Sequence, residues 1–279
     1  MFIAETKAAL SACFEGPYRG KTTGFVPTMG ALHEGHLALV RQALCENETV
    51  VCSIFVNPVQ FNNPDDLEKY PRTLAEDVRM LEQAGCHVLF HPGVPEMYPE
   101  PPDEKYDFGL LEQVMEGSFR PGHFNGVAIV VKRLFDLVKP DRAYFGEKDY
   151  QQLLIVKALV KMCHMPVEIV PCPTVREADG LAMSSRNRRL SPGHRRLAPV
   201  IRQSLISLKA SRDRIPLEQA IQQAADRIDA VPDFRVEYLE VADAVSLKPA
   251  KHWDAFPSLV CCTAVWAGDV RLIDNILIL

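Results

Sequence analysis

The chain has 279 residues, of which 47% are hydrophobic and 24% are charged, and these proportions exclude a disordered protein, a collagen and a disulfide miniprotein. This length allows one large domain or two modest ones, with enough chain to bury a core. With 31 basic and 36 acidic residues, the formal net charge is -5, which argues against a dedicated nucleic-acid binder but allows a local cationic pocket.

The cysteines and the N-terminal segment indicate the cellular compartment in which the protein is expected. Eight cysteines occur, mostly within apolar runs, and none has CxxC spacing, which predicts reduced and buried thiols. Residues 1–10 lack the basic start and long apolar stretch of a signal peptide, and no apolar run reaches the ~18 residues of a membrane span. We therefore expect a cytoplasmic protein without a membrane segment.

Strand-like and helical patterns alternate through the first 171 residues. The continuous apolar run at 49–56 is typical of a strand buried on both faces, and Thr73 followed by Glu76 predicts a capping box. This alternation predicts an α/β fold, with a Rossmann-like parallel sheet that carries helices on both faces. The expected strands are 23–28, 49–56, 87–90, 142–145 and 167–171, and the expected helices are 36–47, 73–84, 125–138 and 149–163.

The pattern changes after about residue 173. Two helices are expected at 193–210 and 216–230, and then strands at 235–241, 258–266 and 270–278. The turn at 268–269 joins the last two strands in an antiparallel pair. We expect a smaller α+β C-terminal domain, with the boundary between domains 1–174 and 175–279.

Three near-matches to known motifs fail. Residues 16–22 have three residues between their glycines instead of the four of a P-loop, and they precede a strand. The run 33–36 places its second histidine one residue too early for the zinc motif HExxH, and no third ligand is evident, so we assign no metal ligands. No GxGxxG dinucleotide-binding fingerprint is present.

Four segments place polar residues and glycines where strands end. In 27–36 (PTMGALHEGH), Gly30 permits a sharp turn, and two histidines stand at a helix N-terminus, which favours an anion. In 55–61, Gln60 offers a donor and an acceptor. In 145–152, Lys148 can place a point charge at phosphate oxygens.

The fourth segment, 181–187, sets small hydroxyls beside Arg186 as an anion clamp, although the charged run 186–189 is also compatible with a solvated surface. Two histidines, one lysine and one arginine at strand ends suit a polyphosphate with a reacting phosphorus. Phosphoryl and nucleotidyl transfer depend mainly on charge stabilisation and positioning.

The motifs also carry a resemblance. The run 33–36 resembles the HxGH signature of the nucleotidyltransferase superfamily, and 183–186 resembles its flexible KMSKS counterpart. More narrowly, the chain resembles the pantothenate synthetase family along nearly its whole length. The matching motifs are PTMGALHEGH, FVNPVQF, YPRT, RPGHFNGV, PDRAYFGEKDYQQL, READGLAMSSRN and RLIDN.

The resemblance implies an ATP-dependent ligase that joins pantoate and β-alanine through pantoyl adenylate. It implies magnesium with ATP, no tightly bound organic cofactor, no nucleic-acid or membrane partner, a homodimer, and a C-terminal lid domain. It makes His36 the proton donor, with His33, Lys148 and Arg186 as further catalytic residues. The implied ATP contacts are Met29, Gly30, Ala31, Leu32, His33, Glu34, Gly35, His36, Gly146, Glu147, Lys148, Asp149, Val175, Met183, Ser184, Ser185 and Arg186.

The resemblance further implies that Gln60 and Gln152 bind pantoate and that Gln60 also binds β-alanine. The loop 60–73, with Glu76 and Asp77, is expected to help with magnesium or to close the site. Two other interpretations stay open: another nucleotidyltransferase, which would lack the glutamine pair, and a non-catalytic nucleotide sensor on the same fold.

Overall fold

A computed structural model describes residues 1–212 and 214–278 of the chain. The chain divides into two compact units. The first comprises Met1–Phe108, Arg120–Glu147 and Gln152–Pro173, and the second comprises Gly109–Phe119, Lys148–Gln151 and Thr174–Leu279. Two short segments from the first two thirds of the chain therefore belong to the second unit.

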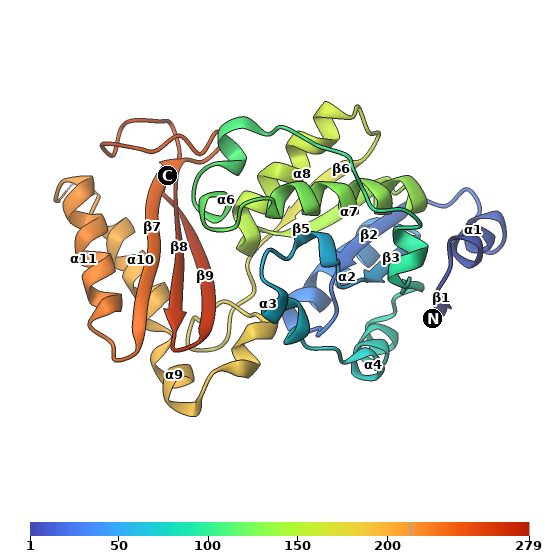
Figure 1. The fold of residues 1–279 in the computed structure, drawn as a ribbon, viewed down its shortest axis with the longest axis horizontal. Helices are drawn as coiled ribbons and strands as arrows, with labels where there is room; N and C mark the ends of the chain where they lie inside the picture. Colours follow the sequence, from blue (N-terminus) through green and yellow to red (C-terminus); the bar gives the residue numbers. More distant parts are fainter. Residues whose placement is uncertain (213, 279) are drawn as a thin grey trace. The chain divides into compact units, whose positions relative to one another are not determined.

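A six-stranded sheet, all of whose pairs are parallel, forms the first unit (Figure 1). The strand order is β1-β4-β3-β2-β5-β6. The strands are β1 Phe2–Ala4, β2 Thr23–Thr28, β3 Thr49–Ile54, β4 Val88–Phe90, β5 Arg142–Gly146 and β6 Glu168–Cys172. The helices are α1 Lys7–Glu15, α2 Glu34–Glu46, α3 Pro64–Glu68, α4 Leu74–Ala84, α5 Val94–Met97, α7 His123–Val138 and α8 Tyr150–Met162, the last of which starts in the second unit.

Helices cover both faces of this sheet, as predicted. Successive side chains of a strand point to opposite faces. Val26 of β2 lies in one buried cluster with Leu39 of α2, whereas the ring of its neighbour Phe25 packs edge-on against Phe135 of α7, with 6.2 Å between centroids. A strand that is covered on both faces buries side chains in both directions, which explains why apolar residues fill most positions of β3, with Thr49 and Ser53 as buried exceptions.

Most predicted elements are confirmed to within a few residues, and two details are wrong. Thr73 makes no capping bond, because its hydroxyl donates to the Asp77 carboxylate instead, at 3.2 Å. The helix predicted at 193–210 is two helices, α9 Pro192–Leu197 and α10 Val200–Ala210. The break falls at Pro199, which has no N–H to continue the helix. The first strand, α1 and the short helices α3, α5 and α6 (Glu116–Phe119) were not predicted.

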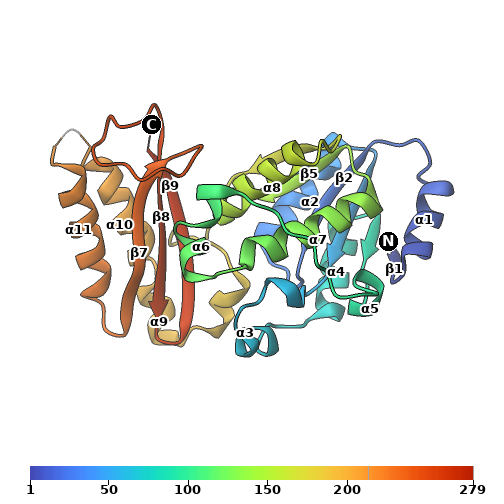
Figure 2. The same cartoon turned by 45° about the horizontal axis from the view of Figure 1, so that its top comes forward.

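The second unit contains an antiparallel sheet in the order β7-β8-β9. Its strands are β7 Phe234–Asp243, β8 Leu259–Ala267 and β9 Val270–Ile278, and its helices include α6 Glu116–Phe119 and α11 Leu217–Asp229. Figure 2 shows α10 and α11 along one face of this sheet, where Leu205 and Ile228 join the buried cluster with Leu272 of β9. The predicted α+β architecture of this part is thus confirmed.

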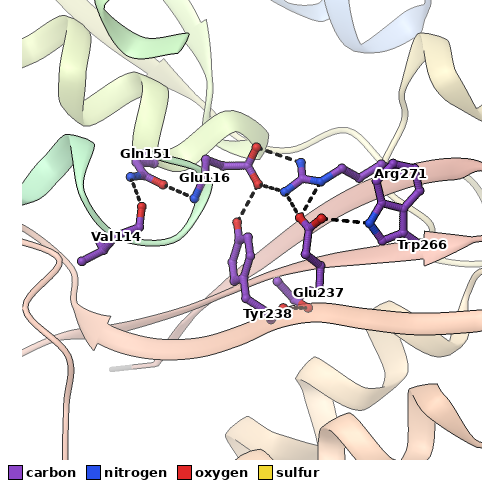
Figure 3. A network of polar contacts seen from close by, with 8 residues as sticks. Val114, Glu116, Gln151, Glu237, Tyr238, Trp266 and Arg271 are labelled. Atoms are coloured by element: carbon purple, nitrogen blue, oxygen red, sulfur yellow. Dashed lines mark hydrogen bonds and ion pairs between the residues drawn. The ribbon is translucent and has the colours of Figure 1, made fainter. Parts of the chain in front are cut away.

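A network of buried charges connects α6 to this sheet (Figure 3). The Arg271 guanidinium donates to both carboxylate oxygens of Glu116, at 2.7 and 2.8 Å, and to Glu237, at 2.7 Å. The Tyr238 hydroxyl donates to Glu116, and the Trp266 indole donates to Glu237, each at 2.9 Å. Burial opposes the charge of Arg271, but the hydrogen bonds to the two carboxylates outweigh this effect and raise its pKa.

Gln151 attaches the same segment from its other side. Its side-chain oxygen accepts from the Glu116 backbone N–H at 3.1 Å, and its amide nitrogen donates to the carbonyls of Leu111 and Val114, at 2.7 and 2.9 Å. Gln151 is buried, so these bonds replace the water that its amide would otherwise bind. Segment Gly109–Phe119 is therefore held by side chains that are distant in the sequence.

Within the described residues, no helix is long and apolar enough to cross a membrane.

We predict that Glu116→Ala destabilises the protein by about 3–5 kcal/mol, because it removes one partner of a buried ion pair and the acceptor of the Tyr238 hydroxyl. Urea unfolding, followed by circular dichroism, measures this loss. Gln113→Ala, on the same segment but exposed, is the control and should change stability by less than about 0.5 kcal/mol. Equal urea midpoints of unfolding for the two variants would refute a stabilising role of the network.

Candidate active site

The strand order reverses at β2. From β2 the chain adds β3 on one side, whereas β5 pairs with the other side of β2 and is followed outward by β6. In parallel α/β sheets, ligands bind outside the carboxyl ends of the strands at such a switch point. The segments that leave these two ends are Met29–His33 after β2 and Glu147–Asp149 after β5, and both were singled out from the sequence.

The loop after β2 is held by a buried carboxylate. Asp77 of α4, only 1% exposed, accepts from the backbone N–H groups of Ala31 at 2.9 Å and Leu32 at 2.8 Å. The Thr73 hydroxyl is a third donor. Both carboxylate oxygens of Asp77 thus support the loop, and the help with magnesium or site closure that the resemblance implied stays a prediction.

Gly30 is required by this geometry. Its φ is +82°, and a Cβ there would lie 3.0 Å from Ile54 and 3.1 Å from the Asp77 carboxylate. A side chain would be strained by the backbone angle and would also press on the anchor of the loop. The glycine lets the chain turn sharply between β2 and α2, as the sequence predicted.

His33 and His36 form one unit at the start of α2. The Nδ1 of His33 accepts from the Gly35 N–H at 3.1 Å, and the Nδ1 of His36 accepts from the His33 N–H at 3.3 Å. The ring centroids are 4.1 Å apart. Because each Nδ1 is an acceptor, a neutral ring carries its proton on Nε2 and has an Nε2–H to donate. The helix N-terminus beside the rings also favours an anion.

Gln60 lies in a short 3₁₀ turn, Pro58–Gln60, that follows β3. It is only 7% exposed, and its side-chain oxygen accepts from Asn57 at 3.1 Å. Its amide nitrogen contacts the sulfur of Met29 at 3.3 Å. A thioether is a weak acceptor, so this N–H group is suited to a stronger acceptor such as a ligand carboxylate. The contact also brings two predicted binding segments together.

The position of Gln60 is fixed by neighbours that were not predicted as site residues. Asn57, fully buried, donates to the Gly126 carbonyl at 3.1 Å and accepts from the Tyr98 hydroxyl at 2.7 Å. The Gln60 carbonyl lies 2.9 Å from Nδ1 of the buried His123. A Cβ at Gly126 would lie 2.7 Å from the Gln60 Cα, so only glycine allows this approach. The polar residues in FVNPVQF and RPGHFNGV were the available signal.

The second unit holds the remaining cationic candidates. Lys148 lies in the turn Glu147–Asp149, with its ammonium 3.6 Å from Asp149 Oδ2. The N–H of Met183 donates to the Val175 carbonyl at 3.0 Å, which brings two predicted ATP contacts together. Ser184 caps the 3₁₀ turn Ser185–Arg189, which carries Arg186, by accepting from the Arg186 N–H at 3.2 Å.

Gln152 lies on α8, partly buried, and belongs to the first unit.

No group of three or more His, Cys, Asp or Glu side chains that could hold a metal ion occurs in residues 1–212 and 214–278. The cysteines among these residues are all free thiols, and burial raises the pKa of several of them, including that of Cys86 to about 11.

The fold and the first-unit site define a doubly wound α/β protein of the nucleotide-binding kind, with an anion-binding helix N-terminus at the switch point of its sheet. The family model described as pantoate-beta-alanine ligase matches residues 2–277. The chain therefore belongs to the pantoate-beta-alanine ligase family, a family of enzymes.

Relatives agree over almost the full length. A pantothenate synthetase of Bacteroides fragilis is 50% identical over 258 residues, which are 92% of each chain. The crystal structure of the Thermus thermophilus pantothenate synthetase is similar with a TM-score of 0.92 and 46% identity, covering 99% of each chain. A pantoate-beta-alanine ligase from Francisella tularensis, complexed with beta-gamma ATP and beta-alanine, has a TM-score of 0.84 and 34% identity, covering 99% of this chain and 97% of its own.

We predict that Asp77→Ala lowers turnover about 100-fold, because the loop that carries the histidines loses its anchor and a shift of ~1 Å in a site costs about that factor. Two buried N–H groups would also lose their acceptor, which costs about 1–3 kcal/mol each. Steady-state kinetics and thermal unfolding measure the two effects. Glu82→Ala, exposed on the same helix, is the control, and equal turnover in both variants would contradict the anchoring role.

Proposed function

We propose that this chain condenses pantoate with β-alanine to pantothenate, using ATP, through a pantoyl-adenylate intermediate, and releases AMP and pyrophosphate. The observation that carries the proposal is the pair of histidines that the Asp77-anchored loop places at the N-terminus of α2. Family membership and the Francisella ligase, which was crystallised with beta-gamma ATP and beta-alanine, support ATP and β-alanine as substrates.

In the first step, a pantoate carboxylate oxygen attacks the α-phosphorus of ATP, a new P–O bond forms, and the bond to pyrophosphate breaks. Negative charge builds on the phosphate oxygens and on the leaving group. The Nε2–H groups of His33 and His36 donate to these oxygens, and the Lys148 ammonium and Arg186 guanidinium supply positive charge. His36, which the resemblance makes the proton donor, gives its hydrogen bond from Nε2 and keeps the proton, since a neutral ring cannot release it. Donors held in place before the reaction stabilise this charge without reorganisation.

Pantoate is held by Gln60 and Gln152. The Gln60 amide exchanges its weak sulfur acceptor for a pantoate oxygen, while Asn57 keeps the other end of the same side chain fixed. In the second step, the β-alanine amine, as its free base, attacks the acyl carbon of the adenylate, and the C–N bond forms. AMP leaves with the electron pair of the broken C–O bond, and the proton that the nitrogen loses passes to solvent. Gln60 also contacts the incoming β-alanine.

The nucleotide contacts are the residues that the resemblance implies, namely Met29–His36, Gly146–Asp149, Val175 and Met183–Arg186. Magnesium arrives with ATP as part of the substrate, since Mg²⁺ commonly binds phosphates and water with few protein carboxylates. A homodimer, a cytoplasmic location and a lid role for 175–279 belong to the same proposal.

Pyrophosphate exchange into ATP tests the function. We expect exchange that depends on pantoate and proceeds without β-alanine, and AMP release once β-alanine is added. Exchange that ignores pantoate would favour another nucleotidyltransferase. ATP binding without exchange or AMP release would favour a nucleotide sensor.

We predict that His36→Ala and Lys148→Ala each lower the pantoate-dependent exchange rate by about 10²–10³-fold, the usual loss for one preorganised stabiliser of developing charge. The exposed Lys157→Ala on α8 is the control for removal of a lysine. A folded His36 or Lys148 variant that turns over within tenfold of the unaltered enzyme would contradict the assigned role.

Gly146 provides a separate test of where ATP lies. Among the described atoms, none lies within 4 Å of a Cβ built at Gly146, apart from its chain neighbours, and its φ is not in the positive region. The chain itself therefore has no need of glycine there. We predict that Gly146→Ala keeps its stability and raises the KM for ATP about tenfold, because the methyl group occupies space that the nucleotide uses. Gly193→Ala, also with room for its methyl group, is the control, and an unchanged KM would remove Gly146 from the ATP site.

A further inference from the structure

The run 271–275 (RLIDN) of β9 is one of the motifs of the family, yet the reaction described above uses none of its residues. Three of its side chains make long-range polar contacts inside the second unit. Arg271 binds Glu116, Asp274 binds Arg176, and Asn275 binds Lys148. The last contact joins this strand directly to a proposed catalytic residue.

The Asn275 amide nitrogen donates to the Lys148 carbonyl at 2.9 Å. Asn275 is only 9% exposed, so this hydrogen bond is shielded from competing water. The bond holds the backbone of the turn Glu147–Asp149 and therefore fixes the point from which the Lys148 side chain starts.

Asn275 is itself held in place. Its backbone N–H donates to Asp274 Oδ1 at 2.7 Å, and the Asp274 carboxylate receives both terminal nitrogens of Arg176, at 2.8 and 2.9 Å. Asp274 is 4% exposed, and such two-point pairs between a guanidinium and a carboxylate have a fixed geometry. Arg176 pairs with Ala182 in an isolated bridge, next to the segment that begins at Met183.

We propose that Asn275 is a positioning residue that aims the Lys148 ammonium at the phosphates of ATP by holding the Lys148 carbonyl. The lysine side chain is a flexible four-carbon stem, so its charge reaches one place only if the backbone and the neighbours restrict it. The inference rests on the proposed function of Lys148. It adds a residue of β9 that acts on the reaction without touching substrate.

A double-mutant cycle on the full-length enzyme tests the proposal, with pantoate-dependent pyrophosphate exchange as the readout. Asn275→Asp keeps the size of the side chain and removes the donor to the Lys148 carbonyl. We expect an exchange rate about 10–100-fold lower, as for a misplaced catalytic group, while the KM for β-alanine in the complete reaction stays unchanged. In a Lys148→Ala background the same substitution should lower the rate by less than about threefold, because its effect passes through Lys148.

Thr263→Val is the control. Thr263 is fully buried on β8, opposite Asp274, and its hydroxyl donates to the Tyr238 carbonyl at 2.8 Å. This variant also removes a buried hydrogen bond from the sheet, so it should lower the unfolding temperature and leave the exchange rate per folded molecule unchanged. Thermal unfolding of every variant gives the folded fraction.

The proposal is overturned if Asn275→Asp lowers the exchange rate by the same factor in the unaltered enzyme and in the Lys148→Ala background. It is also overturned if Asn275→Asp alone has the exchange rate of the unaltered enzyme. If Asn275→Asp does not fold, Asn275→Ser takes its place in the cycle, and the same two outcomes overturn the proposal. Failure of the proposed function is separate, since the unaltered enzyme would then show no pantoate-dependent exchange.

Discussion

The pairing of β2 on both of its sides is the constraint on which the first unit depends. Because β3 and β5 flank β2 in parallel, the segments that leave β2 and β5 begin at the same edge of the sheet. No pairing within one stretch of sequence could produce this, since residues 28 and 146 are far apart in the chain. The position of the candidate site is therefore a consequence of the strand order, which places the segments after β2 and β5 at one edge of the sheet.

Buried polar side chains then convert a strand edge into a defined site. Asp77 and Asn57 are almost inaccessible. Asp77 accepts from two N–H groups of the loop after β2, whereas Asn57 bonds the Gly126 carbonyl of α7 and the Tyr98 hydroxyl. An isolated buried carboxylate or amide is costly, but one whose partners are all in place removes alternative loop conformations. His33 and His36 follow the same principle, since their Nδ1 atoms are used within the helix start and their tautomers are thereby set.

The second unit uses charge in a comparable way. Arg271 between Glu116 and Glu237, and Arg176 against Asp274, connect the three-stranded sheet to segments that come from other parts of the chain. Pairs of this kind contribute little net stability compared with apolar packing, but they become strongly destabilising when one partner is lost. Each carboxylate and guanidinium of these pairs has its partner in the native arrangement, so an arrangement that separates them would leave charges buried without a partner. β9 thus acts as the common attachment for residues 116, 148 and 176.

The sequence by itself determined the classes of element and the chemistry at their ends. Alternating apolar runs predicted the parallel sheet, and PTMGALHEGH, Gln60 and Lys148 were recognisable because glycines and polar groups interrupt apolar strands. The break at Pro199 was also present in the sequence, as a proline inside a predicted helix. The tertiary structure decided the supporting roles of Asp77, Asn57 and Asn275. The three supporting roles depend on partners 46, 69 or 127 residues away. Local propensity contains no information on which distant N–H or carbonyl group will lie beside a given side chain, and burial alone turns that proximity into a constraint.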